Sequence, residues 1–348
     1  MALPTTYRAF RRTEGDLPHS IQLSEETLPQ NIESHDVLIE IHAVSLNYRD
    51  VAMLNGKYPV EVEVRGIPAS DCAAEVVAVG SDVTNFKKGD HVAPIFNLSV
   101  LTGYEDDAMQ ALGGDVPGVL REYAVFDESV LVHLPPHLSW EEASTLTCAG
   151  VTAWSALNWP QSFESTRSVL LQGTGGVSLF ALILCEAAGI TSIITSSSDE
   201  KIANLKKTWS KVEGINYKTS PDQQSEVARL TNGRGVDVVV NNTGVGSLIT
   251  DLKSLRQRGG VVSLVGFLAG LDGQWNPSEL MFIMYKTAIL KGIAVGSKID
   301  YERMNQFLSE RKVSLAPVID KVFPFEQSSE AFDYLYSGKH VGKVVIKL

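Results

Sequence analysis

The residues that most directly suggest chemistry form a glycine-rich turn in the middle of this 348-residue chain. The turn consists of Gly173, Thr174, Gly175, Gly176 and Val177. An apolar run over 169–171 precedes it and apolar residues at helical spacing follow over 179–187, which predicts a strand, a tight turn and a helix. Glycine lets the backbone turn sharply and lets a pyrophosphate approach the N–H groups at the positive end of the helix. The pattern therefore predicts a dinucleotide site, with Ser178 in place of the usual third glycine.

Two other interpretations of this stretch compete with a dinucleotide site. A glycine turn between a strand and a helix also occurs in α/β cores that bind no cofactor. The apolar run also approaches the length of about 20 residues that spans a membrane. Gln172, Glu186 and the interrupting glycines argue against insertion.

The elements around this turn follow one another as in a doubly wound fold. Strand candidates over 168–172, 191–196, 214–217, 236–243, 260–267 and 288–296 alternate with helical stretches. Nearly continuous apolar strands separated by helices indicate a buried parallel sheet, so we expect an α/β domain here.

The chain before this region has a different pattern. From Thr5 to about Ser129, short alternating segments separated by turn signals predict a β-rich unit of Greek-key or barrel type. Polar groups and a short helical pattern over 47–59 interrupt it and are a place to look for chemistry. The stretch 102–126 is expected to be a surface excursion, and Ser139 with Glu142 forms a capping box.

The end of the chain returns to the first unit. Two helical stretches after Lys298 lead to a terminal apolar segment that is predicted to be a strand. We therefore expect residues 1–130 and 297–348 to form one domain, and residues 131–296 to form the nucleotide domain.

Composition excludes several classes of function. A formal net charge of −11 with no basic run argues against nucleic acid and anionic membrane surfaces as partners. The N-terminal residues show no apolar segment behind their arginines, so a cytoplasmic address is expected. Cys72, Cys148 and Cys185 are an odd number at wide spacing, which fits reduced thiols better than disulfides or a structural zinc cluster.

Six blocks in order resemble the medium-chain dehydrogenase/reductase superfamily over nearly the whole chain. They read SLNYRDVAMLNGKYP, AAEVVAVGSDVTNFKKGDHV, CAGVTAW, QGTGGVSLFAL, SSSDEK with INY, and HVGKVVIKL. The chain is most similar to the zinc-free quinone oxidoreductase branch, which includes zeta-crystallin-like proteins. The resemblance implies a GroES-like catalytic domain and a Rossmann domain with the nicotinamide in the cleft between them. It also implies a homodimer or tetramer, often built by joining the nucleotide-domain sheets, and we expect a homodimer.

The resemblance also bears on zinc. The positions of the catalytic zinc ligands in zinc-dependent relatives read Asn47, Ser70 and Cys148 here, so only the last keeps a ligand type. Zinc requires three protein ligands plus water at a catalytic site. The region of the structural zinc lobe, residues 94–119, has no cysteine. We therefore expect no metal.

The expected cofactor is NADPH. An NAD site usually has an acidic residue at the end of the second strand, whereas this strand ends in Thr195, Ser196 and Ser197. The resemblance places the 2′-phosphate of NADPH against Lys201 and Tyr217. In the competing view Asp199 is the carboxylate of an NAD site, but Ser198 and Asp199 precede a run of helix formers and are interpreted as a helix cap.

For the nicotinamide end, the assignments come from the resemblance alone. Thr152 is expected at the carboxamide and Asn47 near the ring, and Gly342 with Lys343 would close over the cofactor. Backbone on both sides of the ring would come from Asn242, Thr243, Gly244, Gly266, Phe267 and Leu268.

Without a metal, the easiest hydride acceptor is a conjugated one, because its charge spreads onto oxygen as an enolate or hydroquinone. The protein must then supply orientation and a hydrogen-bond donor to that oxygen. Tyr58 matches a substrate-lining tyrosine of the family, and Tyr48 and Asn47 are further donors. Arg49 and Asp50 are interpreted as a local ion pair, and solvent can supply the proton.

We therefore expect an NADPH-dependent reductase of quinones or α,β-unsaturated carbonyls, acting on a small-molecule substrate. One alternative is a zinc-independent NADP-dependent alcohol dehydrogenase or carbonyl reductase, in which Tyr48 or Tyr58 protonates an alkoxide. Another, of a different class, is an NADPH-binding protein with a structural or regulatory role and little turnover.

Overall fold

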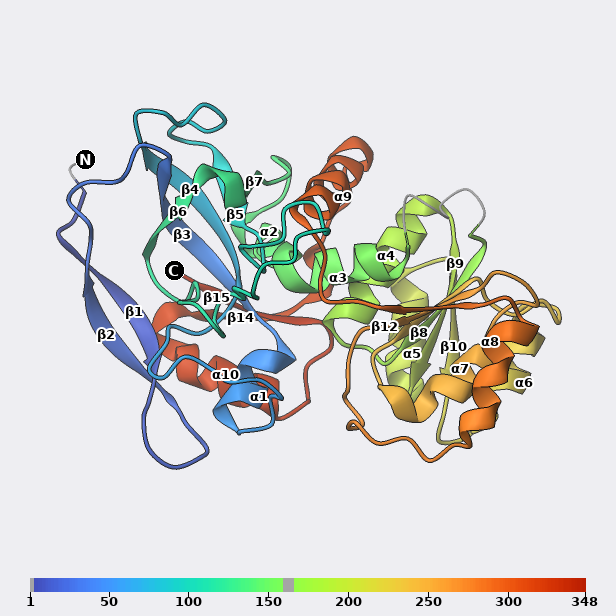
Figure 1. Ribbon diagram of the computed structural model, residues 1–348. Coiled ribbons are helices and arrows are strands. Elements are labelled where there is room, and N and C mark those ends of the chain that lie inside the picture. Colours follow the sequence, from blue (N-terminus) through green and yellow to red (C-terminus); the bar gives the residue numbers. More distant parts are fainter. Residues whose placement is uncertain (1–2, 159–165) are drawn as a thin grey trace. The chain divides into compact units, whose positions relative to one another are not determined.

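The computed structural model describes residues 3–158 and 166–348, which form two compact units (Figure 1). Unit 1 consists of Met1–Val151 and Gly296–Leu348, and unit 2 of Thr152–Val295. The sequence pattern predicted the boundaries at 130/131 and 296/297. The first boundary lies later because the chain after residue 130 packs on unit 1, where Trp140 stacks against His42 and His91.

Unit 2 contains a six-stranded parallel sheet in the order β10-β9-β8-β11-β12-β13. The strands are β8 Ser168–Gln172, β9 Thr191–Ser196, β10 Val212–Asn216, β11 Val238–Asn241, β12 Val261–Leu264 and β13 Ile289–Gly292. The predicted parallel sheet is confirmed. The last three strands are shorter than the apolar runs that predicted them, because each run continues into a loop at the carboxyl edge of the sheet.

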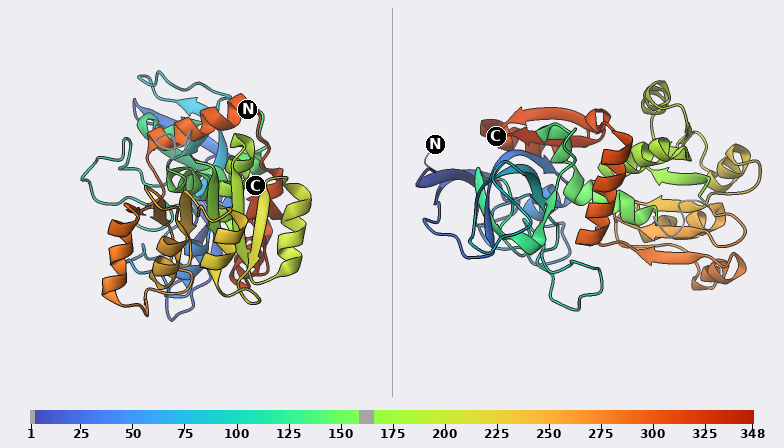
Figure 2. Two further views of the ribbon diagram at one scale, coloured as in Figure 1. Left: turned by 90° about the vertical axis from the view of Figure 1, so that its right-hand side faces the viewer. Right: turned by 90° about the horizontal axis from the view of Figure 1, so that it is seen from above.

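Helices cover both faces of this sheet (Figure 2). They are α3 Val151–Ala156, α4 Gly176–Ala188, α5 Asp199–Thr208, α6 Gln223–Leu230, α7 Leu248–Ser254 and α8 Met281–Tyr285. The chain moves from β8 towards β10 and then from β11 towards β13, so right-handed crossovers place α4 and α5 on one face and α7 on the other. The strand order therefore reverses between β8 and β11, where a doubly wound sheet opens a crevice at its carboxyl edge.

The core of unit 2 is made of the apolar residues of these strands. Leu170, Ile193, Val239 and Val262 are fully buried and pack with Leu252 of α7. Strands buried on both faces carry apolar residues without alternation, which explains why the sequence shows continuous runs.

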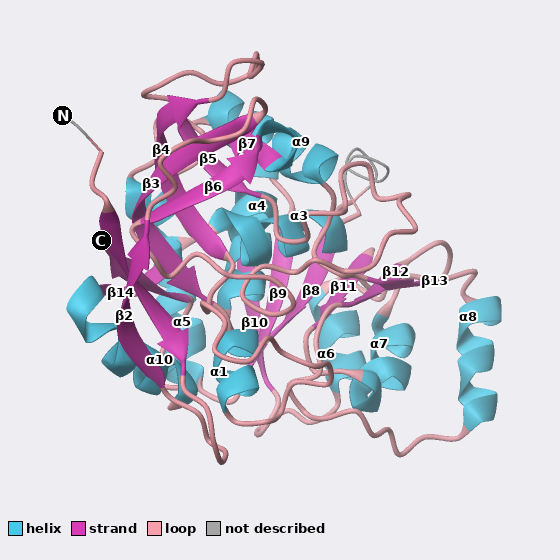
Figure 3. Cartoon of the chain, turned by 60° about the vertical axis from the view of Figure 1, so that its left-hand side comes forward, coloured by secondary structure: helices cyan, strands magenta, loops and turns pink. Residues whose placement is uncertain are grey.

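Unit 1 is built mainly of strands (Figure 3). An antiparallel ribbon pairs β1 Thr6–Arg12 with β2 Ile21–Thr27. The larger sheet has the order β14-β15-β3-β4-β5-β7, with β6 paired to β3. Its strands are β3 Asp36–Leu46, β4 Asp71–Val79, β5 His91–Pro94, β6 Tyr123–Asp127, β7 Leu131–His133, β14 Ile319–Pro324 and β15 Lys343–Lys347.

The C-terminal return is a strand of this larger sheet. β15 pairs antiparallel with β3, with Val344 opposite Leu46. This register brings Lys343 next to the start of the helix that follows β3. The helices of unit 1 are α1 Tyr48–Leu54, α2 Trp140–Ala143, α9 Lys298–Arg311 and α10 Ser328–Tyr336. The predicted capping box is present, since Ser139 Oγ accepts from the Glu142 N–H at the start of α2.

No helix within the described residues has both the length and the apolar character needed to cross a membrane.

Candidate active site

The glycine turn lies at the carboxyl end of β8, at the reversal of strand order. Gly173 has a φ of +78°, which side-chain-bearing residues rarely adopt, and its N–H donates to the Thr195 carbonyl at 3.1 Å. Gly175 is the N-cap of α4. A Cβ added at Gly173 or Gly175 would meet no heavy atom within 4 Å, so the space before the turn is open. The exposed backbone and the helix N-terminus fit a pyrophosphate.

Ser178 occupies the third-glycine position without disturbing the turn. Its buried hydroxyl donates to the Gln172 carbonyl at 2.8 Å and accepts from Asn242 Nδ2 at 2.9 Å. The side chain therefore joins the first turn of α4 to the ends of β8 and β11. The departure from the glycine pattern is explained by these two hydrogen bonds.

The ends of β9 and β10 bring four predicted residues to the same edge of the sheet. Ser196 ends β9, Ser197 follows it, and the Tyr217 N–H donates to the Ser196 carbonyl at 3.1 Å. Lys201 lies in the first turn of α5. Within the described residues, neither the Lys201 ammonium nor the Tyr217 hydroxyl makes a hydrogen bond or an ion pair. These groups are therefore available for an anion.

Asp199 is the first residue of α5, and its side chain is exposed. The N-cap of the helix is Ser198, whose hydroxyl accepts from the Lys201 N–H at 3.3 Å. The prediction of a cap at Ser198 and Asp199 is confirmed for Ser198, while Asp199 supplies the negative charge favoured in a first helical turn.

Two loops after β11 and β12 contain the residues predicted beside the nicotinamide. The Leu268 N–H donates to the Asn242 carbonyl at 3.2 Å, so the loops lie side by side. Gly244 has a φ of +111°, and a Cβ on Gly266 would come within 2.9 Å of the Asn242 carbonyl oxygen. Both positions therefore require glycine. Thr243 and Phe267 lie in the same two loops, and Thr152, the remaining predicted residue of unit 2, is buried in α3.

A buried carboxylate that the sequence analysis missed supports these loops. Asp251 on α7 accepts from Gln172 Nε2 at 2.9 Å, Asn241 Nδ2 at 2.7 Å, Ser247 Oγ at 3.0 Å and Gln223 Nε2 at 3.0 Å. No cation pairs with it among the described residues, and burial raises its pKa to about 6.

The two amides that bind Asp251 also hold backbone in the loop after β11. Gln172 Oε1 accepts from the Thr243 N–H at 3.1 Å, and Asn241 Oδ1 accepts from the Gly244 N–H at 2.7 Å. Each amide oxygen is therefore fixed by backbone, and each NH2 group is turned to Asp251. One carboxylate thus connects the end of β8, directly before the glycine turn, to the loop after β11. An aspartate inside an ordinary amphipathic pattern gave no signal of this role.

In unit 1, the predicted donors cluster around α1. Asp50 is fully buried and accepts from the Asn47 N–H at 2.8 Å, and burial raises the pKa of this carboxyl. Arg49 lies 3.9 Å from Asp50, as the expected ion pair, and its guanidinium also donates to the Leu112 carbonyl at 2.8 Å. Tyr48 is exposed.

Arg49 also fixes the surroundings of Tyr58. Its guanidinium packs over the rings of Tyr58 and Phe96, at 5.4 and 4.8 Å from their centroids. Arg49 Nε donates to the Tyr58 hydroxyl at 3.5 Å. Tyr58 is therefore held by a buried cation.

The predicted residue Lys343 lies inside unit 1. Its ammonium donates to the Leu46 carbonyl at 2.7 Å and to Asn47 Oδ1 at 2.5 Å, and lies 3.6 Å from Asp71. Gly342 precedes it with a φ of +98°. Asp71, which the sequence analysis did not single out, also accepts from Ser70 Oγ at 2.6 Å.

The side chains at the zinc-ligand positions do not fit zinc. Asn47 Oδ1 is bound by an ammonium, and Ser70 Oγ donates to Asp71. Cys148 is a free cysteine in the π-helical segment Leu146–Gly150, and burial raises the pKa of its thiol to about 12, which disfavours the thiolate that binds zinc. Over residues 3–158 and 166–348, no three His, Cys, Asp or Glu side chains are grouped to hold a metal ion.

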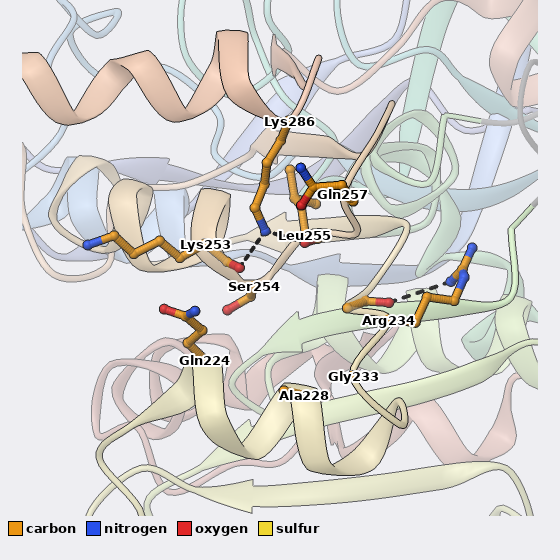
Figure 4. A pocket seen from close by; sticks show the side chains of 10 residues that line it. Gln224, Ala228, Gly233, Arg234, Lys253, Ser254, Leu255, Gln257 and Lys286 are labelled. Carbon is orange, nitrogen blue, oxygen red and sulfur yellow. Dashed lines mark hydrogen bonds between the residues drawn. The ribbon is translucent and has the colours of Figure 1, made fainter.

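Unit 2 also contains a pocket (Figure 4). Arg234, Leu255 and Lys286 line it, and they precede β11, β12 and β13, so the pocket is at the amino edge of the sheet. Lys286 Nζ donates to the Lys253 carbonyl at 2.7 Å. None of the predicted site residues contributes to this pocket.

Known proteins match the whole chain. A family model described as an alcohol dehydrogenase GroES-like domain matches residues 33–136, and one described as a zinc-binding dehydrogenase matches residues 176–310. A zinc-type alcohol dehydrogenase-like protein of Schizosaccharomyces pombe is 39% identical over 93% of this chain and 94% of its own. A quinone oxidoreductase of Rattus norvegicus is 27% identical, with 98% of each chain covered.

A solved structure shows the same fold. It is named as an alcohol dehydrogenase of Sinorhizobium meliloti 1021, is 34% identical, covers 100% of both chains and has a TM-score of 0.89. These matches confirm the predicted fold class, a GroES-like β-rich unit with a Rossmann sheet.

Proposed function

Because the chain belongs to the medium-chain dehydrogenase/reductase superfamily of oxidoreductases, we propose that it transfers hydride from NADPH to quinones or α,β-unsaturated carbonyls without a metal. The observation that carries this proposal is the set of side chains at the zinc-ligand positions. With Lys343 on Asn47 and Ser70 on Asp71, these three positions do not form a ligand set for a metal ion that could polarise an isolated carbonyl. A conjugated acceptor needs less polarisation, because the charge spreads as hydride arrives.

NADPH, when bound, would supply the hydride. In an enone its two electrons form the new C–H bond at the β carbon, the C=C π pair moves into the bond next to the carbonyl, and the carbonyl π pair moves onto the oxygen. The chain must stabilise the charge on that oxygen with a hydrogen-bond donor. Asn47, Tyr48 and Tyr58 carry such donors. No side chain is required as an acid, because solvent can protonate the resulting enolate to the saturated carbonyl.

The carboxyl ends of β9 and β10 support NADPH rather than NADH. Two hydroxyls, Ser196 and Ser197, lie where an NAD site would have a carboxylate, and Lys201 and Tyr217 offer a cation and a hydroxyl beside them. The side chain of Asp199 is exposed and could bind the ribose hydroxyls of NADH, so preference for NADH is the alternative outcome.

Other proposed cofactor contacts in unit 2 lie at the same carboxyl edge of the sheet. The glycine turn and α4 would take the pyrophosphate, and the loops with Gly244 and Gly266 would flank the nicotinamide. Thr152 and Gly342 remain proposed contacts.

Carbonyl or alcohol oxidoreduction is the second candidate, because one similar protein is named as a zinc-type alcohol dehydrogenase-like protein and the similar solved structure as an alcohol dehydrogenase. It requires an acid strong enough for an alkoxide, such as Tyr48 or Tyr58. An NADPH-binding protein with little turnover is the third.

We also propose a homodimer built on β13. This strand ends the sheet of unit 2, and Ile289 and Leu290 on it are exposed. Met281, Met284 and Tyr285 on α8, which precedes β13 in the chain, are also exposed. An unpaired apolar edge strand favours pairing with a second copy.

The test compares oxidation of NADPH and NADH with quinones, enones, aldehydes and ketones, with metal analysis of the same sample. We expect turnover of quinones or enones with NADPH and no stoichiometric zinc. Turnover of aldehydes or ketones alone would favour the second candidate. Cofactor binding without turnover of any acceptor would favour the third, and stoichiometric zinc would contradict the metal-free proposal.

A further inference from the structure

We propose that Lys343 and Asp71 are positioning residues that fix the Asn47 amide as the hydrogen-bond donor to the substrate oxygen. This inference rests on the proposed function and deepens it. In this proposal one amide group of the chain, Asn47 Nδ2, stabilises the negative charge that develops on the substrate oxygen. The buried ion pair of Lys343 and Asp71 fixes the orientation of that group.

The geometry around Lys343 leaves its ammonium little freedom. It is 2% exposed and donates to the Leu46 carbonyl and to Asn47 Oδ1, while Asp71 Oδ2 lies 3.6 Å away. Asp71 is itself fully buried and accepts from Ser70 Oγ and from the Cys148 N–H at 3.1 Å. The ammonium is therefore held by two hydrogen bonds and by an ion pair with Asp71, so Lys343 is not free to follow a cofactor.

The same contacts determine which way the Asn47 amide faces. An ammonium can only donate, so the atom that meets it must be the amide oxygen and not the NH2 group. The backbone N–H of Asn47 is held by Asp50. Both the main chain and the side chain of Asn47 are therefore fixed, the main chain by the Asp50 carboxylate and the side chain by the Lys343 ammonium.

The NH2 group of Asn47 then has no acceptor. Its nitrogen is buried and makes no hydrogen bond within the described residues, whereas most buried donors in native proteins are paired. A substrate oxygen would supply the missing acceptor. The ammonium on Oδ1 also draws electron density from the amide, which makes its N–H groups stronger donors to a developing negative charge.

The first experiment measures kcat and KM for an acceptor that the wild-type protein reduces, and the dissociation constant of NADPH. The variants are Asn47→Ala, Lys343→Arg, the double variant Asp71→Asn with Lys343→Met, and the triple variant that adds Asn47→Ala. The double variant removes both charges together, because removing one alone would leave the other buried and unpaired. Lys347→Met is the matched control, since Lys347 is on the same strand but exposed and paired with Glu141.

We expect Asn47→Ala and the double variant to lower kcat by about 100-fold, the loss typical for one donor to an oxyanion, with unchanged NADPH affinity. Lys343→Arg keeps the charge and should retain more activity than the double variant. The kcat of the triple variant should lie within about two-fold of the kcat of Asn47→Ala, because the three residues act as one unit. Losses that multiply in the triple variant, or a weaker affinity for NADPH with unchanged kcat, would overturn the proposal.

A second measurement is independent of turnover. The side-chain amide ¹⁵N–¹H signals of Asn47, assigned by their loss in Asn47→Ala, should shift in the double variant and stay in place in Lys347→Met. Unshifted signals in the double variant would overturn the positioning role. If the wild-type protein reduced no acceptor but the signals shifted, the proposed function would fail while the positioning of Asn47 would stand.

Discussion

At the scale of single residues, the preference for NADPH depends on Lys201. Its ammonium has no partner within the described chain, and it lies in the first turn of α5, three residues after the N-cap Ser198. A hydrogen bond between charged groups contributes about 1.5–3 kcal/mol, so Lys201→Ala should raise the KM for NADPH by at least about tenfold. The KM for NADH, which has no 2′-phosphate, should not change. Steady-state kinetics with both cofactors measures the difference.

Lys207→Ala is the control for this substitution. Lys207 is exposed on the same helix and donates to Asn204 Oδ1 at 3.2 Å. Both variants lose one positive charge from α5, so a general electrostatic effect would raise KM equally in the two. Equal changes, or a rise in KM for NADH as well, would show that Lys201 does not bind the 2′-phosphate.

At the scale of elements, Asp251 connects β8, β11, α6 and α7 through one carboxylate. Its pKa is raised from 3.8 to about 6 by burial. The carboxyl therefore keeps its proton to a higher pH in the folded state than in the unfolded state. The stability that this difference contributes is complete below about pH 4 and is lost as the pH rises through about 6. The shift corresponds to about 3 kcal/mol in total, of which roughly 1 kcal/mol is lost between pH 5 and pH 7.

Asp251→Asn removes this titration. We expect the difference in unfolding free energy between wild type and variant to move by roughly 1 kcal/mol in favour of wild type when the pH is lowered from 7 to 5. Urea denaturation at several pH values measures it, and the exposed Asp272→Asn serves as the control. Curves for wild type and Asp251→Asn that stay parallel across this range would contradict the prediction.

The sequence predicted elements wherever the signal is local. Glycine at 173 and the apolar run before it predicted β8, the turn and α4, because both cues lie within one short stretch. Lys343 and Asp71 show the limit: they meet only because β15 pairs with β3 and β3 pairs with β4, and no pattern joins residues so far apart in the chain. Trp140 packs on His42 and His91 for the same non-local reason, so the first domain boundary was expected too early.

At the scale of the whole molecule, the proposed homodimer depends on the free edge of β13. The Ile289 and Ile293 N–H groups donate to Gly260 and Leu264 carbonyls on the β12 side. Since N–H groups of a strand alternate between its two sides, the Leu290 N–H faces the free edge. Leu290→Pro removes this donor without removing a bond to β12, and proline is tolerated on edge strands. The variant should therefore keep its fold and lose the pairing of two sheets.

Light scattering after size-exclusion chromatography measures this outcome. The wild-type protein should have twice the chain mass of 37.8 kDa, and Leu290→Pro should approach a single chain mass. Leu290→Val is the control, because it keeps the N–H and an apolar side chain and should remain dimeric. Circular dichroism must show that the proline variant is folded, since unfolding would also abolish assembly. A folded Leu290→Pro that stays dimeric would place the interface elsewhere, because an edge pairing of β13 cannot form in register without the Leu290 N–H.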